Sequence, residues 1–197
     1  MTMSANHPAG AGAHPSPARD RPATATQRRW ELHQLTAPII TAPTARQSLT
    51  ALCEALARIL CVPDIAVTIN DGHPEPVLLV ATSRTASRAV AAQRELQQGP
   101  HLAATTMGSS TVASTLAADQ RWPEAAAVLA NLGLDTALAL PLAFNGRRLG
   151  AVSLYARTHQ RFDDEQLQAA QLLVDVAAAN HAYRRRSVMS TVPMLHQ

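Results

Sequence analysis

The dipeptide Asn145-Gly146 stands between two apolar segments, residues 136–144 and 147–155, and it constrains the fold more than any other feature of the chain. Asn-Gly accommodates the positive φ angles of a type I′ turn, so the two segments are predicted to pair as a β-hairpin. Both faces of this hairpin are apolar, which predicts a central position in a sheet that is covered on both sides. With a two-residue loop, the expected cross-strand partners are Leu140 with Ala151, Leu142 with Leu149, and Ala139 with Val152.

A helix and a second hairpin are predicted nearer the N-terminus. From Leu49 to Leu60 apolar residues recur every three or four positions, which predicts a helix that ends before Pro63. Over residues 65–69 the period changes to two, which predicts a half-buried strand that stops at Asp71-Gly72. This strand is expected to pair with a second strand over residues 77–82.

Two further helices are predicted before the central hairpin. Residues 84–98 favour a helix, which Gly99-Pro100 closes. Pro123 suits the first turn of a helix, where its missing N–H costs nothing, and Gly133 ends that helix. Between these helices a short strand is expected within residues 111–115.

The last helix is predicted to begin with Asp163 as its N-cap, Gln166 closing a capping box, and Phe162 and Leu167 as a hydrophobic staple. We expect this helix to run to about Tyr183. Apolar residues lie on two of its faces, so one face can pack on the sheet and the other is left for a helix–helix contact. The spare face consists of Leu172, Val176 and Ala179. A homodimer through the terminal helices is therefore expected. The alternative is a monomer in which this face is exposed and only weakly apolar because of its alanines.

The ends of the chain differ in composition from its middle. Residues 1–29 are rich in Pro and Ala and are predicted to form a disordered arm, which precedes a domain over 30–183 and a short basic tail over 184–197. A short helix starting at Trp30 is expected to be interrupted by Pro38. All 17 basic residues are Arg, but residues 30–183 carry ten Arg against 13 acidic residues. Nucleic acid is therefore not expected as a partner of the domain, and only the ends could bind phosphate.

The cysteines and the hydropathy of the chain indicate a cytoplasmic protein. Cys53 and Cys61 lie eight positions apart in one predicted helix, which fits two reduced thiols better than a disulfide or a metal site. No apolar run is long enough to span a bilayer, and the N-terminus lacks the apolar core of a signal peptide. We expect no membrane association.

Several segments resemble the C-terminal half of GAF domains. They are Leu138-Ala139-Leu140-Pro141-Leu142, the residues from Asn145 to Tyr155, and Phe162-Asp163-Asp164-Glu165. Gly99-Pro100-His101 and Arg121-Trp122-Pro123 are similar to segments of actinobacterial GAF proteins that often carry a C-terminal RNA-binding ANTAR module. The resemblance covers residues 45–183. Only 14 residues follow Tyr183, so we expect no ANTAR module in this chain.

The resemblance implies a fold and a role. The fold is an α/β (α+β) domain of the GAF/PAS-like kind, with a central antiparallel sheet and helices on its faces. The role is a non-catalytic signal-sensing or regulatory domain, commonly dimeric, that binds a small molecule or a partner protein. A ligand-less structural dimerisation module is the alternative, and a redox enzyme of the free methionine sulfoxide reductase type is a minor one. No cofactor is indicated.

The resemblance also places a ligand between the sheet and residues 99–132. The candidate contacts are His101, Arg121, Trp122, Thr82 and Tyr155. For each of them a structural role is the alternative: a polar loop residue or helix cap for His101, a Trp that anchors a helix beside a solvated Arg, and strand-end packing for the other two. The chain has no Lys, which excludes the Lys-dependent motif of cyclic-nucleotide-binding relatives. The eight His are scattered singly, so no metal site is predicted.

Overall fold

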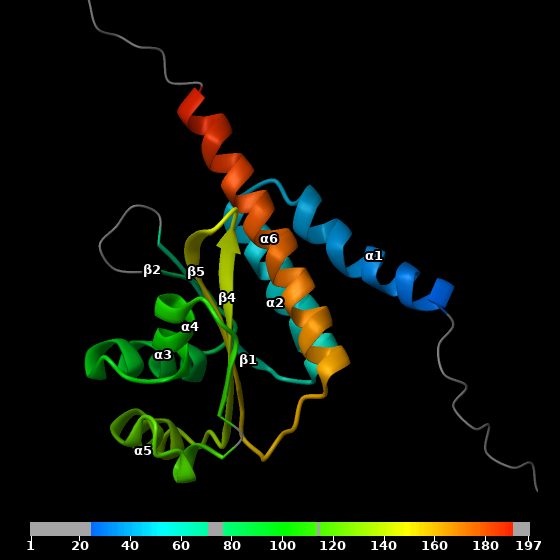
Figure 1. Cartoon of the computed structure of the whole chain (residues 1–197). Coiled ribbons are helices and arrows are strands. Elements are labelled where there is room, and N and C mark those ends of the chain that lie inside the picture. Colours follow the sequence, from blue (N-terminus) through cyan, green and yellow to red (C-terminus); the bar gives the residue numbers. More distant parts are fainter. Residues whose placement is uncertain (1–24, 71–76, 114, 191–197) are drawn as a thin grey trace, which may run out of the picture.

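The computed structural model describes residues 25–70, 77–113 and 115–190. The strands form one five-stranded sheet in the order β2-β1-β5-β4-β3, and every pairing in it is antiparallel. Helices cover both faces of this sheet, as Figure 1 shows, so the predicted fold class is confirmed. The strands are β1 (Asp64–Ile69), β2 (Val77–Ala81), β3 (Thr111–Ala113), β4 (Thr136–Phe144) and β5 (Arg147–Ala156). The helices are α1 (Ala25–Thr41), α2 (Ala45–Leu60), α3 (Arg84–Leu96), α4 (Pro100–Met107), the 3-10 turn η1 (Leu116–Ala118), α5 (Pro123–Asn131) and α6 (Asp164–Ser190).

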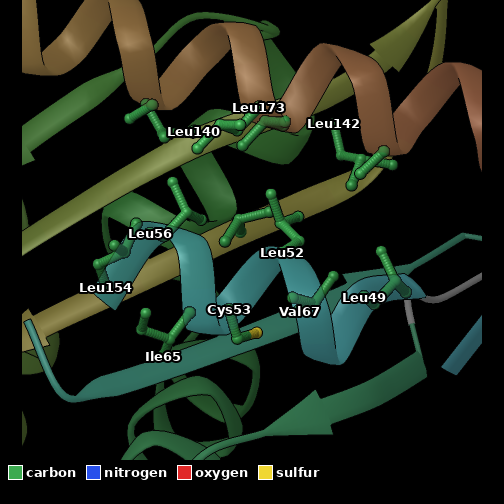
Figure 2. Close-up of a cluster of buried hydrophobic side chains, with 14 of the residues drawn as sticks. Leu49, Leu52, Cys53, Leu56, Ile65, Val67, Leu140, Leu142, Leu154 and Leu173 are labelled. Atoms are coloured by element: carbon green, nitrogen blue, oxygen red, sulfur yellow. The ribbon is translucent and has the colours of Figure 1, made fainter. Parts of the chain in front are cut away.

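The two faces of the sheet carry different helices (Figure 1). Helices α2 and α6 pack on one face and on each other, and α1 lies against both of them. Helices α3, α4 and α5 lie on the opposite face. The larger core lies under α2 and α6, where leucines of both helices meet the aliphatic side chains of β1, β4 and β5 (Figure 2). The opposite face is lined mainly by smaller side chains, among them Ala66, Ala137, Ala139 and Ala151.

A β-bulge in the central hairpin shifts its predicted register. Asn145 and Gly146 form the two-residue turn with φ angles of 48° and 73°, as predicted. Beyond Ala143 the register changes by one residue, because Leu149 is an extra residue that has no partner on β4. The predicted pairs beyond this point are therefore wrong. The observed pairs are Leu142 with Gly150, Leu140 with Val152, and Ala139 with Ser153.

The bulge decides which side chains of β5 face which helices. Since side chains alternate along a strand, a shift of one residue exchanges the two faces. Val152 and Leu154 join the core under α2 and α6. Leu149 also belongs to this core, although it is the extra residue of the bulge. Ser153 and Tyr155 consequently face α3 and α4, where both contact residues of those helices.

Strand β1 is fully buried rather than half-buried. All six of its residues are buried, because β1 lies between β2 and β5 and has α2 on one face and α3 on the other. Its antiparallel pairing with β2 confirms the predicted N-terminal hairpin. The predicted stop at Asp71-Gly72 lies outside the described residues.

Helix α1 continues through Pro38 to Thr41, so the predicted interruption is wrong. The proline removes one helical hydrogen bond, but tertiary contacts hold the residues that follow it. Ile39 is fully buried, and its carbonyl accepts hydrogen bonds from Ser48 Oγ at 2.7 Å and Asn180 Nδ2 at 2.8 Å. The helix begins at Ala25, inside the predicted arm, because a nucleated helix extends at little cost. Residues 1–24 of that arm lie outside the described residues.

Helix α6 begins with the predicted capping box and ends later than predicted. Asp163 and Gln166 exchange hydrogen bonds of 2.7 and 3.1 Å between side chain and backbone. The helix continues past Tyr183 to Ser190, so the first seven residues of the predicted tail are helical. Arg184 supports this extension, because its guanidinium donates to carbonyl groups at the C-terminal end of α1. These belong to Ile40, Ala42 and Pro43.

Gly99-Pro100 separates α3 from α4 and also begins α4. Helix α3 ends at Leu96, with Gln97 in the left-handed conformation. Pro100 is then the first residue of α4, a helix that the sequence did not predict. The short strand within residues 111–115 and the helix that begins at Pro123 are both confirmed.

The structure requires a glycine at position 150, next to the bulge, because the backbone of β1 leaves no room for a Cβ there. Replacing Gly150 with Ala is expected to destabilise the fold by more than about 3 kcal/mol, because a Cβ there would overlap the carbonyl oxygen of Thr68. Gly146→Ala is the matched control: φ is also positive, but an added Cβ has no atom within 4 Å, so the expected loss is about 1 kcal/mol. Urea unfolding of both variants measures the difference. Equal losses would show that the contact with Thr68 does not constrain the sheet.

Candidate functional site

His101 lies on the first turn of α4 with its imidazole against the sheet. Its side chain is 0% exposed, although the ring is polar and the residue follows a Gly-Pro turn. The ring reaches two strands: Nδ1 lies 2.8 Å from Ser153 Oγ of β5, and Nε2 lies 3.4 Å from Thr68 Oγ1 of β1. The backbone N–H of His101 donates to Gln93 Oε1 of α3 at 2.9 Å. His101 therefore joins α4, α3 and the middle of the sheet.

The contacts of His101 belong to a larger buried group, which we call the polar cluster. It consists of Thr68, Gln93, His101, Ser153 and Tyr155, all between 0 and 1% exposed. Gln93 Nε2 donates to the Tyr155 hydroxyl at 2.7 Å and to the carbonyl of Ala89 at 3.1 Å. The Tyr155 hydroxyl is also hydrogen-bonded to Ser153. The five side chains thus form one connected network across the α4 face of the sheet.

Each ring nitrogen of His101 has a hydroxyl partner, Ser153 at Nδ1 and Thr68 at Nε2. A hydroxyl can both donate and accept, so these partners suit a neutral imidazole, in which one nitrogen donates and the other accepts. The Thr68 hydroxyl also donates to the carbonyl of Ala151 at 3.5 Å, and the Tyr155 hydroxyl accepts from Gln93.

Burial keeps the titratable members of the polar cluster uncharged. Desolvation, with a smaller contribution from the charge of Arg94, lowers the pKa of His101 from 6.5 to about 4. Desolvation also raises the pKa of the Tyr155 hydroxyl well above its usual value of 10. At neutral pH the cluster therefore presents hydrogen-bond donors and acceptors without net charge.

Helix α4 covers the polar cluster with small apolar contacts. Ala104 packs on Ala139 and Ala151 of the sheet, and these three alanines form a cluster of their own. Polar contacts hold the two ends of the helix. Gln93 holds its first turn, and Arg148 donates a hydrogen bond to the carbonyl of Thr106 in its last turn.

Of the five predicted site residues, the structure brings His101 and Tyr155 together in the polar cluster. Thr82 lies elsewhere: its hydroxyl accepts the Ile65 N–H at 2.8 Å and donates to the Pro63 carbonyl at 2.7 Å. Thr82 thus fastens the end of β2 to the start of β1. The space beside His101, where a ligand was expected, is filled in this structure by side chains of α4 and the sheet.

Arg121 and Trp122 form a pair of their own at the start of α5. The guanidinium lies 4.3 Å from the indole centroid and binds both carboxylate oxygens of Asp119, at 3.0 and 2.6 Å. This hydrogen bonding lowers the pKa of Asp119. Trp122 packs partly buried against the core beneath α3 and α5. These contacts match the structural alternative for the pair, in which the ring anchors the helix.

Three members of the polar cluster were missed in the sequence: Thr68, Gln93 and Ser153. Gln93 carried a signal, since it continues the helical spacing of the buried residues Ala86, Ala89 and Val90. A polar residue on the apolar face of a helix needs a partner. Ser153 carried the weaker signal of a hydroxyl within an apolar strand, and the bulge determines the face of the sheet on which it lies.

Neither cysteine lies near the polar cluster. Cys53 is buried in the core under α2 and α6, on the opposite face of the sheet, and desolvation raises its pKa to about 12 (Figure 2). Cys61 is exposed at the C-terminal end of α2. Among the described residues, no three His, Cys, Asp or Glu side chains gather in a way that could hold a metal ion. The described helices include none with the length and hydropathy to cross a membrane.

Comparison with known proteins identifies the family. The GAF domain family matches residues 42–180, and the chain therefore belongs to it. No curated protein shows significant similarity to this chain.

The solved structures confirm the fold at low sequence identity. The GAF domain of a phosphoenolpyruvate-protein phosphotransferase from Coxiella burnetii is 19% identical, with a TM-score of 0.67, and the match covers 85% of this chain and 99% of that one. The corresponding Acinetobacter domain is 10% identical, with a TM-score of 0.66 and coverages of 88% and 100%. A free methionine-R-sulfoxide reductase from Neisseria meningitidis is 14% identical, with a TM-score of 0.60 and coverages of 88% and 97%.

The lowered pKa of His101 predicts a loss of stability in acid. The unfolded chain takes up a proton near pH 6.5, whereas the folded protein takes it up only near pH 4, so stability falls as the pH decreases between these values. The free energy of unfolding lost over this pH range is about 3 kcal/mol. Because His101→Asn removes this titration, the stability difference between wild type and variant should shrink by about that amount from pH 7 to pH 4. Urea unfolding measures it, and a difference independent of pH would contradict a buried neutral imidazole.

Proposed function

We propose that this GAF domain is a non-catalytic sensing domain of a cytoplasmic signalling system, with the polar cluster as its binding site. The observation that carries the proposal is the buried hydrogen-bonded network of five side chains beneath α4. Gly99-Pro100 resembles the corresponding segment of actinobacterial GAF proteins, and His101 stands where those proteins usually have Cys.

Stability alone does not favour a cluster of this composition. Burying polar side chains requires that each one find a partner, and well-packed apolar residues are often as stable or more so. The surrounding face of the sheet is built largely from alanine, which shows that apolar packing is available there. Polar side chains buried where apolar packing would be sufficient for stability are found mainly at functional sites.

The contacts of α4 make this helix the element that would open. Its hold on the sheet depends on alanine contacts and on hydrogen bonds that a polar ligand can replace. By contrast, α5 is anchored by the fully buried Leu129. Separation of α4 from the sheet would expose the small residues Ala103 and Ala104, together with hydrogen-bonding groups that a ligand could satisfy.

The charge state of the polar cluster indicates the kind of ligand. His101 and Tyr155 are both neutral at pH 7, so an ionic ligand would lose its hydration without gaining a counter-charge. The cluster suits an uncharged small molecule that carries both donors and acceptors, such as a nucleobase or a nucleoside.

A ligand panel tests this function. Adenosine, uridine, uracil and nicotinamide are added to the wild-type chain, and the melting temperature is recorded for each. We expect at least one compound to stabilise the protein, by about 2.7 kcal/mol at a hundredfold excess over its Kd. The same compound should slow amide hydrogen exchange in residues 99–108 more than in 123–131, because α4 covers the site and α5 does not.

Matched variants connect the effect to the polar cluster. Ser153→Ala removes a hydroxyl that contacts His101 and should abolish the stabilisation by ligand. Ser87→Ala removes a hydroxyl on the partly buried side of α3 and should preserve it. If no compound stabilises the wild type, or if both variants respond as the wild type does, the ligand-less structural module is the better description.

An enzymatic role of the free methionine sulfoxide reductase type is not supported by the positions of the thiols. Cys53 is buried with a pKa near 12, and thiolate chemistry requires an accessible thiol with a lowered pKa. Cys61 is exposed but lies on the α2 side of the sheet, away from the polar cluster. The likeness to the Neisseria reductase is therefore one of fold.

We further propose that the domain is a homodimer that associates through its terminal helices. Ile40 of α1 and Leu172 of α6 are apolar and 53% and 46% exposed, although both helices belong to the core-forming side of the sheet. Val176 and Ala179, on the spare face of α6, are partly buried. A second copy of these helices would cover the exposed apolar side chains.

A charge on this face tests the dimer. Leu172→Glu should give a monomeric mass in light scattering at micromolar concentration, because two buried carboxylates would oppose association. Ala91→Glu adds the same charge at an exposed position of α3 and should leave the dimer intact. A monomeric wild type would overturn this proposal without affecting the ligand site.

A further inference from the structure

A groove lies on the opposite side of the sheet from the polar cluster, between the β4–β5 turn and the C-terminal part of α6. Its volume is about 390 Å³, which is in the range of small-molecule sites. We call it the arginine groove. The residues that line it are Phe144, Asn145, Arg147, Leu149, Ala182, Arg185 and Arg186.

The spacing of the α6 residues brings two guanidinium groups to one face of the helix. Ala182, Arg185 and Arg186 are at positions i, i+3 and i+4, which lie next to one another on a helix surface. Arg147 comes from the other wall, at the first residue of β5. Three arginines from two elements therefore line one groove.

The neighbouring Arg184 has a different task. Its guanidinium donates to the carbonyl groups of Ile40, Ala42 and Pro43 at the end of α1. The direction of a side chain turns by about 100° with each residue of a helix, so Arg184 can face α1 although the next two residues, Arg185 and Arg186, line the groove. The three consecutive arginines are thus divided between an anchor for α1 and a wall of the groove.

Apolar side chains form the remaining part of the groove. Leu149 is 3% exposed and belongs to the core under α6, and Phe144 packs against the same core. The ring of Phe144 lies 5.7 Å from that of Tyr183 at an angle of 56°, a tilted pair that holds the aromatic ring in place. The arginine groove therefore combines a fixed apolar surface with a cationic wall.

We propose that the arginine groove binds a phosphorylated small molecule with an apolar part, such as a nucleoside diphosphate. Guanidinium groups bind phosphate oxygens through paired hydrogen bonds, and three of them match a ligand with several negative charges. The apolar surface at Phe144 and Leu149 would contact the base. Such a ligand joins the turn between β4 and β5 to the last turns of α6 and so fixes the end of that helix relative to the sheet.

This site is independent of the proposed function of the polar cluster. The two lie on opposite faces of the sheet and differ in chemistry, since one is neutral and the other cationic. The loss of either site leaves the other testable in the same protein.

Titration calorimetry of the full chain with ADP, inorganic pyrophosphate and citrate tests the proposal. We expect ADP to bind more tightly than pyrophosphate, because only ADP has an apolar part, and citrate to bind more weakly than either. The double variant Arg185→Gln/Arg186→Gln should weaken ADP binding at least about tenfold, because two charge-assisted contacts are lost. Raising the salt concentration should weaken binding of the wild type.

A second double variant provides the control for net charge. Arg46→Gln/Arg88→Gln removes the same two charges from exposed positions on α2 and α3, and its affinity for ADP should stay within about twofold of the wild type. Equal weakening by both double variants would show non-specific attraction to a basic protein and would overturn the site. Absence of ADP binding to the folded wild type would overturn it as well, and tighter binding of citrate would exclude phosphate as the preferred group.

Discussion

The extra residue at Leu149 is the constraint on which the two faces of the sheet depend. It shifts the pairing of β5 with β4 by one position, and every side chain beyond it changes face relative to a regular hairpin. Gly150 makes this geometry feasible, since a Cβ there would overlap the Thr68 carbonyl of β1. The aliphatic residues of β5 are thereby directed to the core under α2 and α6. Ser153 and Tyr155 are directed to the polar cluster under α4.

The separation of the two faces explains how one small domain can hold two unlike environments. The face under α2 and α6 is a continuous aliphatic core that supplies most of the apolar burial (Figure 2). The other face has small side chains and a satisfied hydrogen-bond network, so its packing is less dependent on apolar area. A change in α4 can therefore occur while the larger core stays intact, which is the behaviour that a sensing domain requires.

The C-terminal part of α6 connects the arginine groove to the rest of the molecule. This helix packs on the core and continues to Ser190 (Figure 1). Arg184 ties it to the end of α1. The arginine groove joins the same part of α6 to the turn between β4 and β5. Side-chain contacts thus hold the last turns of α6 in place, and an anion bound in the proposed site would act on these same turns.

Local patterns in the sequence were sufficient for most of the elements. Asn145-Gly146 identified the central hairpin, Asp163 with Gln166 identified the start of α6, and Pro123 identified the start of α5. These signals act within a few residues, so no knowledge of distant contacts is required. The same patterns could not show that α1 continues through Pro38, because the contacts that hold Ile39 come from residues 48 and 180.

The sequence by itself therefore determined most of the elements, the antiparallel architecture and two members of the polar cluster, His101 and Tyr155. Only the tertiary structure decided the register of β5, the burial of His101 and its connection to Thr68, Gln93 and Ser153. The physical reason is that a hydrogen-bond network joins residues far apart in the chain: Gln93 and Tyr155 are 62 positions apart, and Thr68 and Ala151 are 83. Their meeting depends on a bulge and a close backbone approach, and neither leaves a periodic signal in the sequence.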